Sequence, residues 1–173
     1  GSLKAQVAAE RMRGRAVGIQ WRTEARFIDH GNCVELLAAH DLVADCTDDL
    51  AVRTLVEKHC RALGIPLVSG AGHGHQLQVI TCMGTDHRRP GKGFFQGHAS
   101  EDQMGCDMRS VPAAVTTMAA ALMALRIEAL LQGDDTLVGV MDLVDCAHGR
   151  WMRIMGPEAG EFLDTPVQPG HHA

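Results

Sequence analysis

Two adjacent carboxylates follow a short, mostly apolar run in the first half of the chain. Residues 41–46 read Asp-Leu-Val-Ala-Asp-Cys, and Thr47, Asp48 and Asp49 come directly after them. Such a run is typical of a buried parallel strand, and ligands of open α/β sheets bind where these strands end. Carboxylate oxygens there could hold Mg²⁺ against phosphates. Asp48 or Asp49 could equally cap the helix predicted next, because an aspartate accepts hydrogen bonds from free helix N–H groups.

Cysteines and histidines are the other residues with ligand or nucleophile chemistry. The 6 cysteines are widely spaced without any Cys-x2-Cys pair, so neither a zinc ribbon nor a dithiol redox motif is predicted. We expect reduced, mostly structural thiols in a cytoplasmic protein. Histidines at 73, 75, 171 and 172 are conceivable metal ligands, although loop and tail histidines are more commonly not ligands.

Composition favours one soluble domain with a real core. The chain has 173 residues, 46% of them hydrophobic, 21% charged and 3% aromatic. Its net charge of -5 gives no electrostatic reason to expect nucleic acid or an anionic membrane as partner. The N-terminus lacks the apolar segment of a signal peptide. The most apolar stretch, 111–125, ends at Arg126, and we expect a buried helix too short to cross a bilayer.

Hydrophobic periodicity predicts an alternation of helices and strands that would position the carboxylates. Helices are expected over 3–12, 34–39 and roughly 50–63, and strands over 16–21, 41–46 and 65–69. A strand, a helix and a strand of these lengths form a βαβ crossover, which indicates a parallel sheet.

The second half of the chain continues the pattern. We expect a strand over 76–83, a long Gly-rich loop over 84–109, a long helix and two antiparallel strands over 137–146 and 150–155. The fold class predicted is therefore α/β, a Rossmann-like, mostly parallel sheet flanked by helices, with antiparallel strands at the C-terminal side. Residues 1–155 would form the domain and 156–173 an extended tail.

Residues 41–49 with Arg53 and residues 62–70 resemble a known signature, D-x-V-x-D-C-T-D-N…R…A-L-G-I-P-L-V-S-G. It belongs to the ThiF/MoeB/HesA family, which is related to the adenylation domains of ubiquitin-activating enzymes. Residues 1–12 and 121–131 are similar to two helices of that family, and 137–151 to its closing strands. The register is kept from residue 1 to about residue 155.

The resemblance implies roles for four residues. Asp48 corresponds to the aspartate that coordinates the Mg²⁺ of ATP, and Thr47 precedes it in the same motif. Lys4 corresponds to a lysine that contacts the triphosphate and offsets charge as pyrophosphate leaves. Cys106 lies near the position of the reactive cysteine in sulfur-transferring members, but Asp107 and its neighbours replace the expected small residues; an ordinary loop thiol is the alternative.

Three departures from the family pattern accompany these matches. The Gly-rich phosphate loop, its preceding strand and the acidic ribose ligand would come before residue 1, so we expect weak ATP binding, if any, by the isolated chain. The family's Cys-x2-Cys zinc pairs are missing, with residues 93–96 in place of the first, and zinc is not expected. Asp49 replaces the usual asparagine.

The resemblance implies ATP-dependent adenylation of the C-terminus of a small ubiquitin-like sulfur carrier protein, within sulfur transfer or cofactor biosynthesis. ATP and Mg²⁺ would be the cofactors, and a homo-oligomer or a complementing chain is expected because family members dimerise. A non-catalytic docking module that has lost nucleotide binding is the main alternative. Half of a nicotinamide-dependent dehydrogenase is a third hypothesis, disfavoured by the Cys-Thr-Asp motif.

Overall fold

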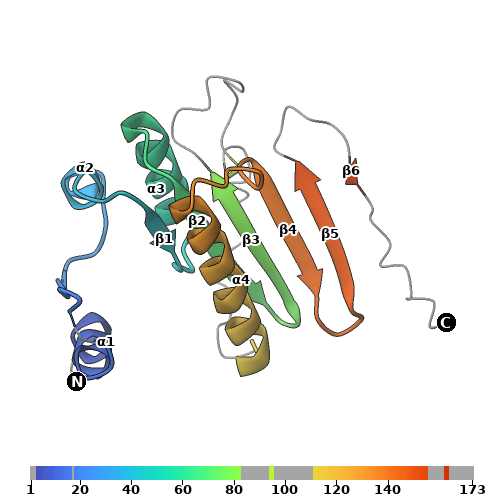
Figure 1. The fold of residues 1–173 in the computed structure, drawn as a ribbon, viewed down its shortest axis with the longest axis horizontal. Coiled ribbons are helices and arrows are strands. Elements are labelled where there is room, and N and C mark those ends of the chain that lie inside the picture. The colour runs from blue at the N-terminus through green and yellow to red at the C-terminus, as the bar shows by residue number, and fades with distance from the viewer. Residues whose placement is uncertain (1–2, 17, 83–93, 96–110, 156–161, 164–173) are drawn as a thin grey trace.

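A computed structural model describes residues 3–16, 18–82, 94–95, 111–155 and 162–163 of the chain. Four helices accompany one sheet (Figure 1). The helices are α1 (Lys4–Arg13), α2 (Cys33–Leu37), α3 (Leu50–Leu63) and α4 (Ala113–Leu131). The strands are β1 (Val43–Asp45), β2 (Leu67–His73), β3 (Gln76–Cys82), β4 (Val140–Asp145), β5 (Arg150–Met155) and β6 (Phe162–Leu163).

The described strands lie in the order β1-β2-β3-β4-β5-β6. β1 and β2 are parallel and joined through α3, as the crossover pattern predicts. The pairs from β2–β3 to β5–β6 are antiparallel, so the parallel part of the described sheet is confined to its first pair. The α/β class, the helices beside the sheet and the antiparallel strands at the C-terminal side are confirmed.

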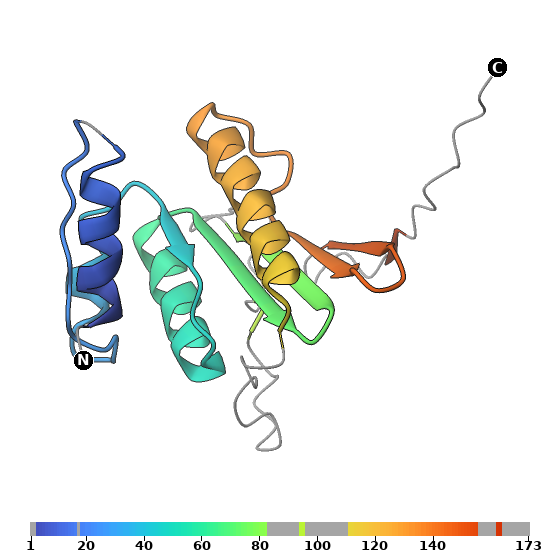
Figure 2. The same ribbon diagram turned by 90° about the horizontal axis from the view of Figure 1, so that it is seen from below.

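Helices cover both faces of the sheet, as Figure 2 shows. Side chains alternate along β2, so Leu67 packs toward α2 and α3, whereas Val68 packs toward α4. Two separate clusters of buried side chains result, one on each face. The cluster beside α2 and α3 is built from aliphatic residues and cysteines with Phe95, and the cluster beneath α4 from aliphatic residues with Met123. The loop that leaves β1 therefore emerges between the two helical layers.

The helix α3 has clear start and stop signals. The Asp49 side chain caps its N-terminus by accepting hydrogen bonds from the N–H groups of Ala51 and Val52. Gly64 ends the helix in the left-handed region with φ 74°, a conformation that glycine adopts without strain. One face of α3, including Leu55, Val56 and Cys60, is buried against the sheet.

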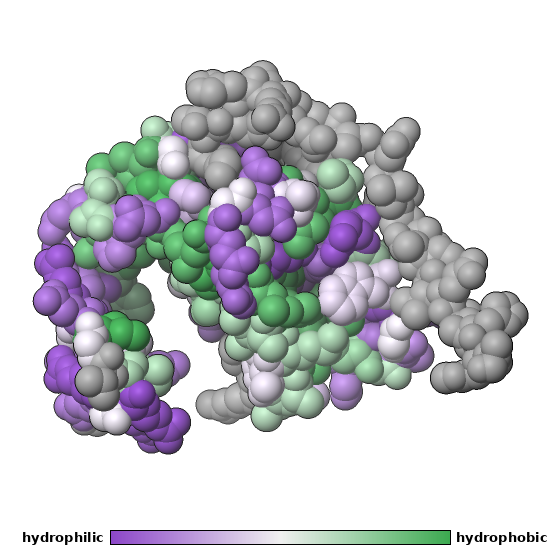
Figure 3. Space-filling view, in the orientation of Figure 1, coloured by the Kyte–Doolittle hydropathy of each residue, from purple (hydrophilic) through white to green (hydrophobic). Residues whose placement is uncertain are grey.

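The helix α4 is the long helix that the sequence predicts, and it extends beyond the apolar stretch 111–125. It runs for 19 residues, so the expectation that this stretch is too short to span a bilayer is wrong; by length and composition alone it is long and apolar enough. Arg126 lies inside this helix, and its buried side chain bonds Asp142 of β4. Val115, Ala119 and Met123 pack on β2 and β3. Figure 3 shows the molecule from the side of α4, with apolar residues on the outer side of this helix, where Leu125 and Leu131 are exposed. The homo-oligomer or complementing chain expected from the sequence stays a prediction.

The strand expected over 16–21 is wrong. The described residues of this range form a bend, a turn and a stretch without regular secondary structure, and Ile19 is exposed. An alternating pattern makes a strand only where a neighbouring strand offers hydrogen bonds, and none of the described strands lies beside this segment. The loop over 84–109, apart from 94–95, and most of the tail lie outside the described residues.

Candidate functional site

A buried carboxylate, that of Asp45, fixes the loop that follows β1. Asp45, 4% exposed, accepts hydrogen bonds from the Thr47 backbone N–H at 2.9 Å and from the Thr47 hydroxyl at 2.8 Å through one oxygen. Its other oxygen accepts from the Ser69 hydroxyl at 2.7 Å. Ser69 pairs with Asp45 across β1 and β2. This network ties Thr47 to the carboxyl ends of both parallel strands, the place where ligands of such sheets bind.

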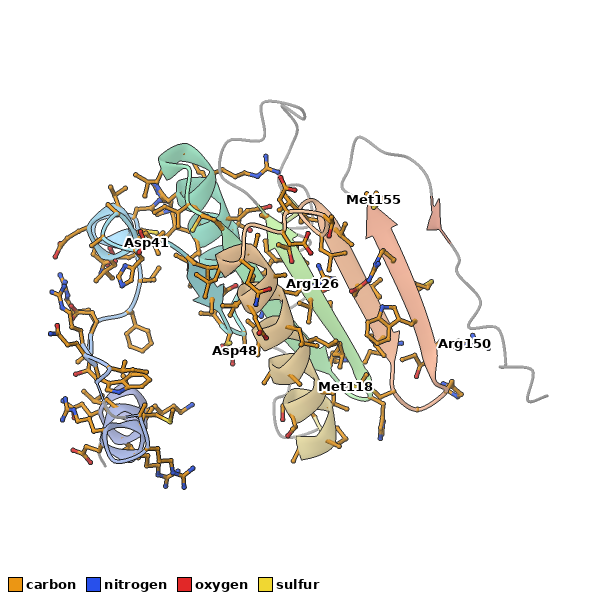
Figure 4. The ribbon with its side chains drawn as sticks, in the orientation of Figure 1. Asp41, Asp48, Met118, Arg126, Arg150 and Met155 are labelled. Carbon is orange, nitrogen blue, oxygen red and sulfur yellow. The ribbon has the colours of Figure 1, made fainter. Side chains whose placement is uncertain are left out.

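The two neighbouring aspartates have different roles. One oxygen of Asp49 accepts from Ala51 N–H at 2.8 Å and from Val52 N–H at 3.2 Å, so Asp49 is the capping residue that the sequence left undecided. Asp48 is exposed, and no hydrogen bond to its side chain is found within the described residues. Figure 4 shows it at the end of the loop. Asp48 therefore keeps its carboxylate oxygens available for a cation or a phosphate-bound metal.

Arg53 also holds this loop, through hydrogen bonds to backbone carbonyls. Its guanidinium, on α3, donates from Nε to the Thr47 carbonyl at 2.7 Å and from Nη2 to the Gly70 carbonyl at 2.6 Å. Nη2 also bonds the Thr47 carbonyl. The side chain is buried, so these bonds are shielded from competing water. A Cβ at Gly70 of β2 would collide with Met123 Sδ, so a larger residue there would require the flexible Met123 side chain to shift.

Lys4 and Cys106 are not brought to this loop by the described residues. Lys4 is exposed in the first turn of α1, and Figures 1 and 4 show α1 standing away from the loop that carries Asp48. Cys106 lies outside the described residues. The structure thus brings together Thr47 and Asp48 of the predicted site and leaves the contributions of Lys4 and Cys106 as predictions.

The profile of the ThiF family matches residues 1–159. The chain belongs to the ThiF family. This match confirms the resemblance drawn from the Cys-Thr-Asp segment and the two helices, and it covers β1, α3 and the site loop together.

Curated relatives share this family segment. Over 159 residues the chain is 28% identical to the sulfur carrier protein ThiS adenylyltransferase of Escherichia coli, a match that covers 86% of the chain and 59% of the relative. It is 44% identical over 52 residues to the molybdopterin-synthase adenylyltransferase of the same organism, covering 30% of the chain and 21% of that relative. The SAMP-activating enzyme E1 of Haloferax volcanii is 35% identical over 81 residues, covering 47% of the chain and 30% of the enzyme.

A solved structure confirms the fold. The crystal structure of PaaA superposes with a TM-score of 0.67 at 14% identity, covering 90% of the chain and 48% of PaaA. The chain therefore spans about half of that structure and 59% of the ThiS adenylyltransferase.

Three buried polar residues of this ThiF-family chain were missed as functional candidates from the sequence. Asp45 and Arg53 shape the loop, and Glu57, 1% exposed, accepts hydrogen bonds from the N–H groups of Phe94 and Phe95. A charged residue within an apolar strand or on the inner face of a helix was the available signal, because buried charges require partners. Among the residues described, no three His, Cys, Asp or Glu side chains converge as a metal site.

Thiol labelling should separate the described cysteines. Burial raises the pKa of Cys60 to about 12, with Cys33, Asp45 and Glu57 adding to the effect, and burial followed by Glu57 raises the pKa of Cys82 further. Because the thiolate is the reactive form, iodoacetamide at pH 8 should modify the exposed Cys46 at least about tenfold faster than either.

Residue-resolved mass spectrometry measures these rates, with the unfolded chain as the reference in which all thiols are accessible. Native Cys60 reacting as fast as Cys46 would contradict the buried cluster. In the same experiment, a transfer role for Cys106 requires it to react faster than Cys33 and Cys146 at pH 7.

Proposed function

We propose that the chain takes part in ATP-dependent adenylation of the C-terminus of a small ubiquitin-like sulfur carrier protein, in sulfur transfer or cofactor biosynthesis. The observation that carries the proposal is the exposed Asp48 on a loop fixed by Asp45 and Arg53 at the carboxyl end of β1. The names of the relatives support the carrier as substrate, since they include adenylyltransferases of ThiS and of molybdopterin synthase.

The residues of the loop suit the proposed chemistry. Bound MgATP would supply the α-phosphate that a carrier carboxylate attacks and the pyrophosphate that leaves. Asp48 offers hard oxygen ligands of the kind that Mg²⁺ takes beside phosphates. Thr47 is held by Asp45, so the backbone leading to Asp48 is ordered before any ligand arrives. Lys4 would offset the charge that develops on the phosphates, which requires α1 to approach the loop.

Carrier-dependent exchange of labelled pyrophosphate into ATP tests the proposal, because only reversible formation of an acyl-adenylate produces it. We expect exchange that requires both Mg²⁺ and a ubiquitin-like carrier with an intact C-terminus. A carrier truncated at its C-terminus is the control and should support none. Exchange that proceeds equally well without any carrier would contradict adenylation of a carrier protein.

A non-catalytic docking module is the second candidate. It is favoured by the position of α1, the helix that begins at Lys4, away from the loop of Asp48 (Figure 4), and by the second negative charge of Asp49. Such a module would bind the carrier in titration calorimetry with the same affinity in the presence and absence of MgATP, and it would give no exchange. Exchange above the carrier-free background excludes it.

A further inference from the structure

Arg53 and Glu57 lie one helical turn apart on α3, and both charges are buried. Their exposed fractions are 5% and 1%. The chemistry proposed above uses neither side chain directly. A charge taken out of water is costly unless hydrogen bonds replace its hydration, so the partners of these two residues indicate what the charges are for.

Glu57 holds a short turn of the segment between β3 and α4. Its Oε1 accepts a hydrogen bond from Phe94 N–H at 2.7 Å, and its Oε2 accepts one from Phe95 N–H at 3.2 Å. Hydrogen bonds from backbone N–H groups to a carboxylate are stronger than those between neutral groups. The Phe95 ring is 6% exposed and belongs to the core cluster beneath α3.

Arg53 contacts both this turn and the loop of Asp48. Its Cζ lies 5.9 Å from the centre of the Phe95 ring, within the range of a cation–π contact. The same guanidinium donates to the carbonyls of Thr47 and Gly70. The same guanidinium therefore lies over the ring of Phe95 and holds the backbone that precedes Asp48. A movement of Arg53 that changes one of these contacts also changes the other.

We propose that Arg53, Phe95 and Glu57 form a mechanical link between residues 47–49 and the turn at 94–95, which makes Arg53 a positioning residue for Asp48. A ligand that orders one end of the link stabilises the other end, since coupling between two sites is reciprocal. The link itself exists without a ligand; the inference rests on the proposed function only in taking Asp48 as the group that is positioned.

Amide hydrogen exchange followed by NMR on the ligand-free 173-residue chain tests the link without requiring any activity. Glu57→Gln removes one acceptor of the turn and should speed exchange of the Thr47 N–H by about threefold to tenfold, a factor between those of an exposed and a fully desolvated cation–π contact. Arg53→Met should in turn speed exchange of the Phe94 and Phe95 N–H groups. Rates are compared with those of Val79 in the central strand β3.

Phe95→Leu isolates the contact that joins the two ends. It keeps an apolar side chain but removes the ring, so Thr47 exchange should rise as in Glu57→Gln, and adding Glu57→Gln should then raise it no further. Asp145→Asn removes an exposed carboxylate contact to His148 on β4 and is the control; it should leave both ends unchanged relative to Val79.

Thr47 exchange within twofold of the parent chain in both Phe95→Leu and Glu57→Gln would overturn the link. Either variant alone suffices for this outcome if the other does not fold. Because no nucleotide or carrier is present, the result is separate from the fate of the proposed adenylation.

Discussion

Replacing Asp48 with asparagine is expected to lower carrier-dependent ATP–pyrophosphate exchange by about a hundredfold or more, the typical loss when a preorganised group that stabilises transition-state charge is removed. The substitution keeps the size of the side chain and removes the negative charge that would hold Mg²⁺. Asp48 is exposed and has no hydrogen bond within the described residues, so the fold should be unaffected. Initial exchange rates at saturating ATP and carrier measure the effect.

Asp49→Asn is the matched control beside it. Asparagine caps a helix as well as aspartate does, so the hydrogen bonds to Ala51 and Val52 should persist and the stability should not change. Exchange should stay within about twofold of the parent chain, because removing a capping charge takes nothing from the metal. Equal losses of exchange rate in the two variants would show that any negative charge near the loop contributes and that Asp48 has no specific role.

Replacing Asp142 with alanine is expected to lower the free energy of unfolding by about 3–5 kcal/mol, the cost of breaking a buried ion pair by removing one partner. Asp142, 2% exposed on β4, bonds Arg126 of α4 and accepts from Arg153 of β5 at 2.8 Å. The variant would leave the buried Arg126 guanidinium with the Thr81 hydroxyl and the Leu137 carbonyl as its partners. Urea unfolding followed by circular dichroism measures the change.

Two further variants separate charge from packing in this prediction. Asp145→Ala lies on the same strand but removes an exposed contact to His148, so its effect should be much smaller. The pair Arg126→Met with Asp142→Leu replaces both charges by apolar groups and should recover most of the lost stability, as buried ion pairs often allow. A loss below about 1 kcal/mol for Asp142→Ala would refute the buried pair.

The same carboxylate should shape the acid unfolding curve. Burial by itself raises the pKa of Asp142, but hydrogen bonds from Arg153 and Trp151 and the charge of Arg126 outweigh it and leave the pKa below its usual value. A lowered folded-state pKa means that its stabilisation is present above the unfolded pKa of about 4 and is lost as the pH falls through the folded value. Asp142→Asn should therefore lose stability less steeply below pH 4.

Local sequence patterns predicted the positions of the helices and strands well, but they predicted the pairing of the strands less well. The crossover from β1 through α3 to β2 follows from apolar runs, a cap and a glycine that are adjacent in sequence. The apolar residues of β3 do not indicate whether this strand runs parallel or antiparallel to β2, because a continuous apolar run is compatible with both. The signal was the turn: Gly74 and His75 alone separate the paired His73 and Gln76, and a loop of two residues permits only an antiparallel hairpin.

The site was predicted in part for a similar reason. Asp48 and Thr47 could be found because motif and strand end coincide in sequence. The residues that fix them depend on distant partners: Asp45 bonds a hydroxyl 24 positions away, and Glu57 bonds amides 37 and 38 positions away. No periodicity encodes such contacts. The same holds for Arg126. Its charge suggested the end of an apolar stretch, but its guanidinium bonds Asp142 of β4, which lies 16 positions further along the chain.

The lengths of the outer strands bear on whether another chain can add to the sheet. The strands at the two ends of the described order are the shortest, with 3 residues in β1 and 2 in β6, whereas the strands between them have 6 or 7. The outermost strand of a sheet presents unpaired N–H and C=O groups that can template the addition of another chain. Among the described residues, β1 pairs with Leu67, Val68 and Ser69 of β2, and β6 pairs with Arg153 and Ile154 of β5. The outer sides of β2 and β5 are therefore only partly covered in the described sheet, and a strand of another chain would find backbone groups to pair with there.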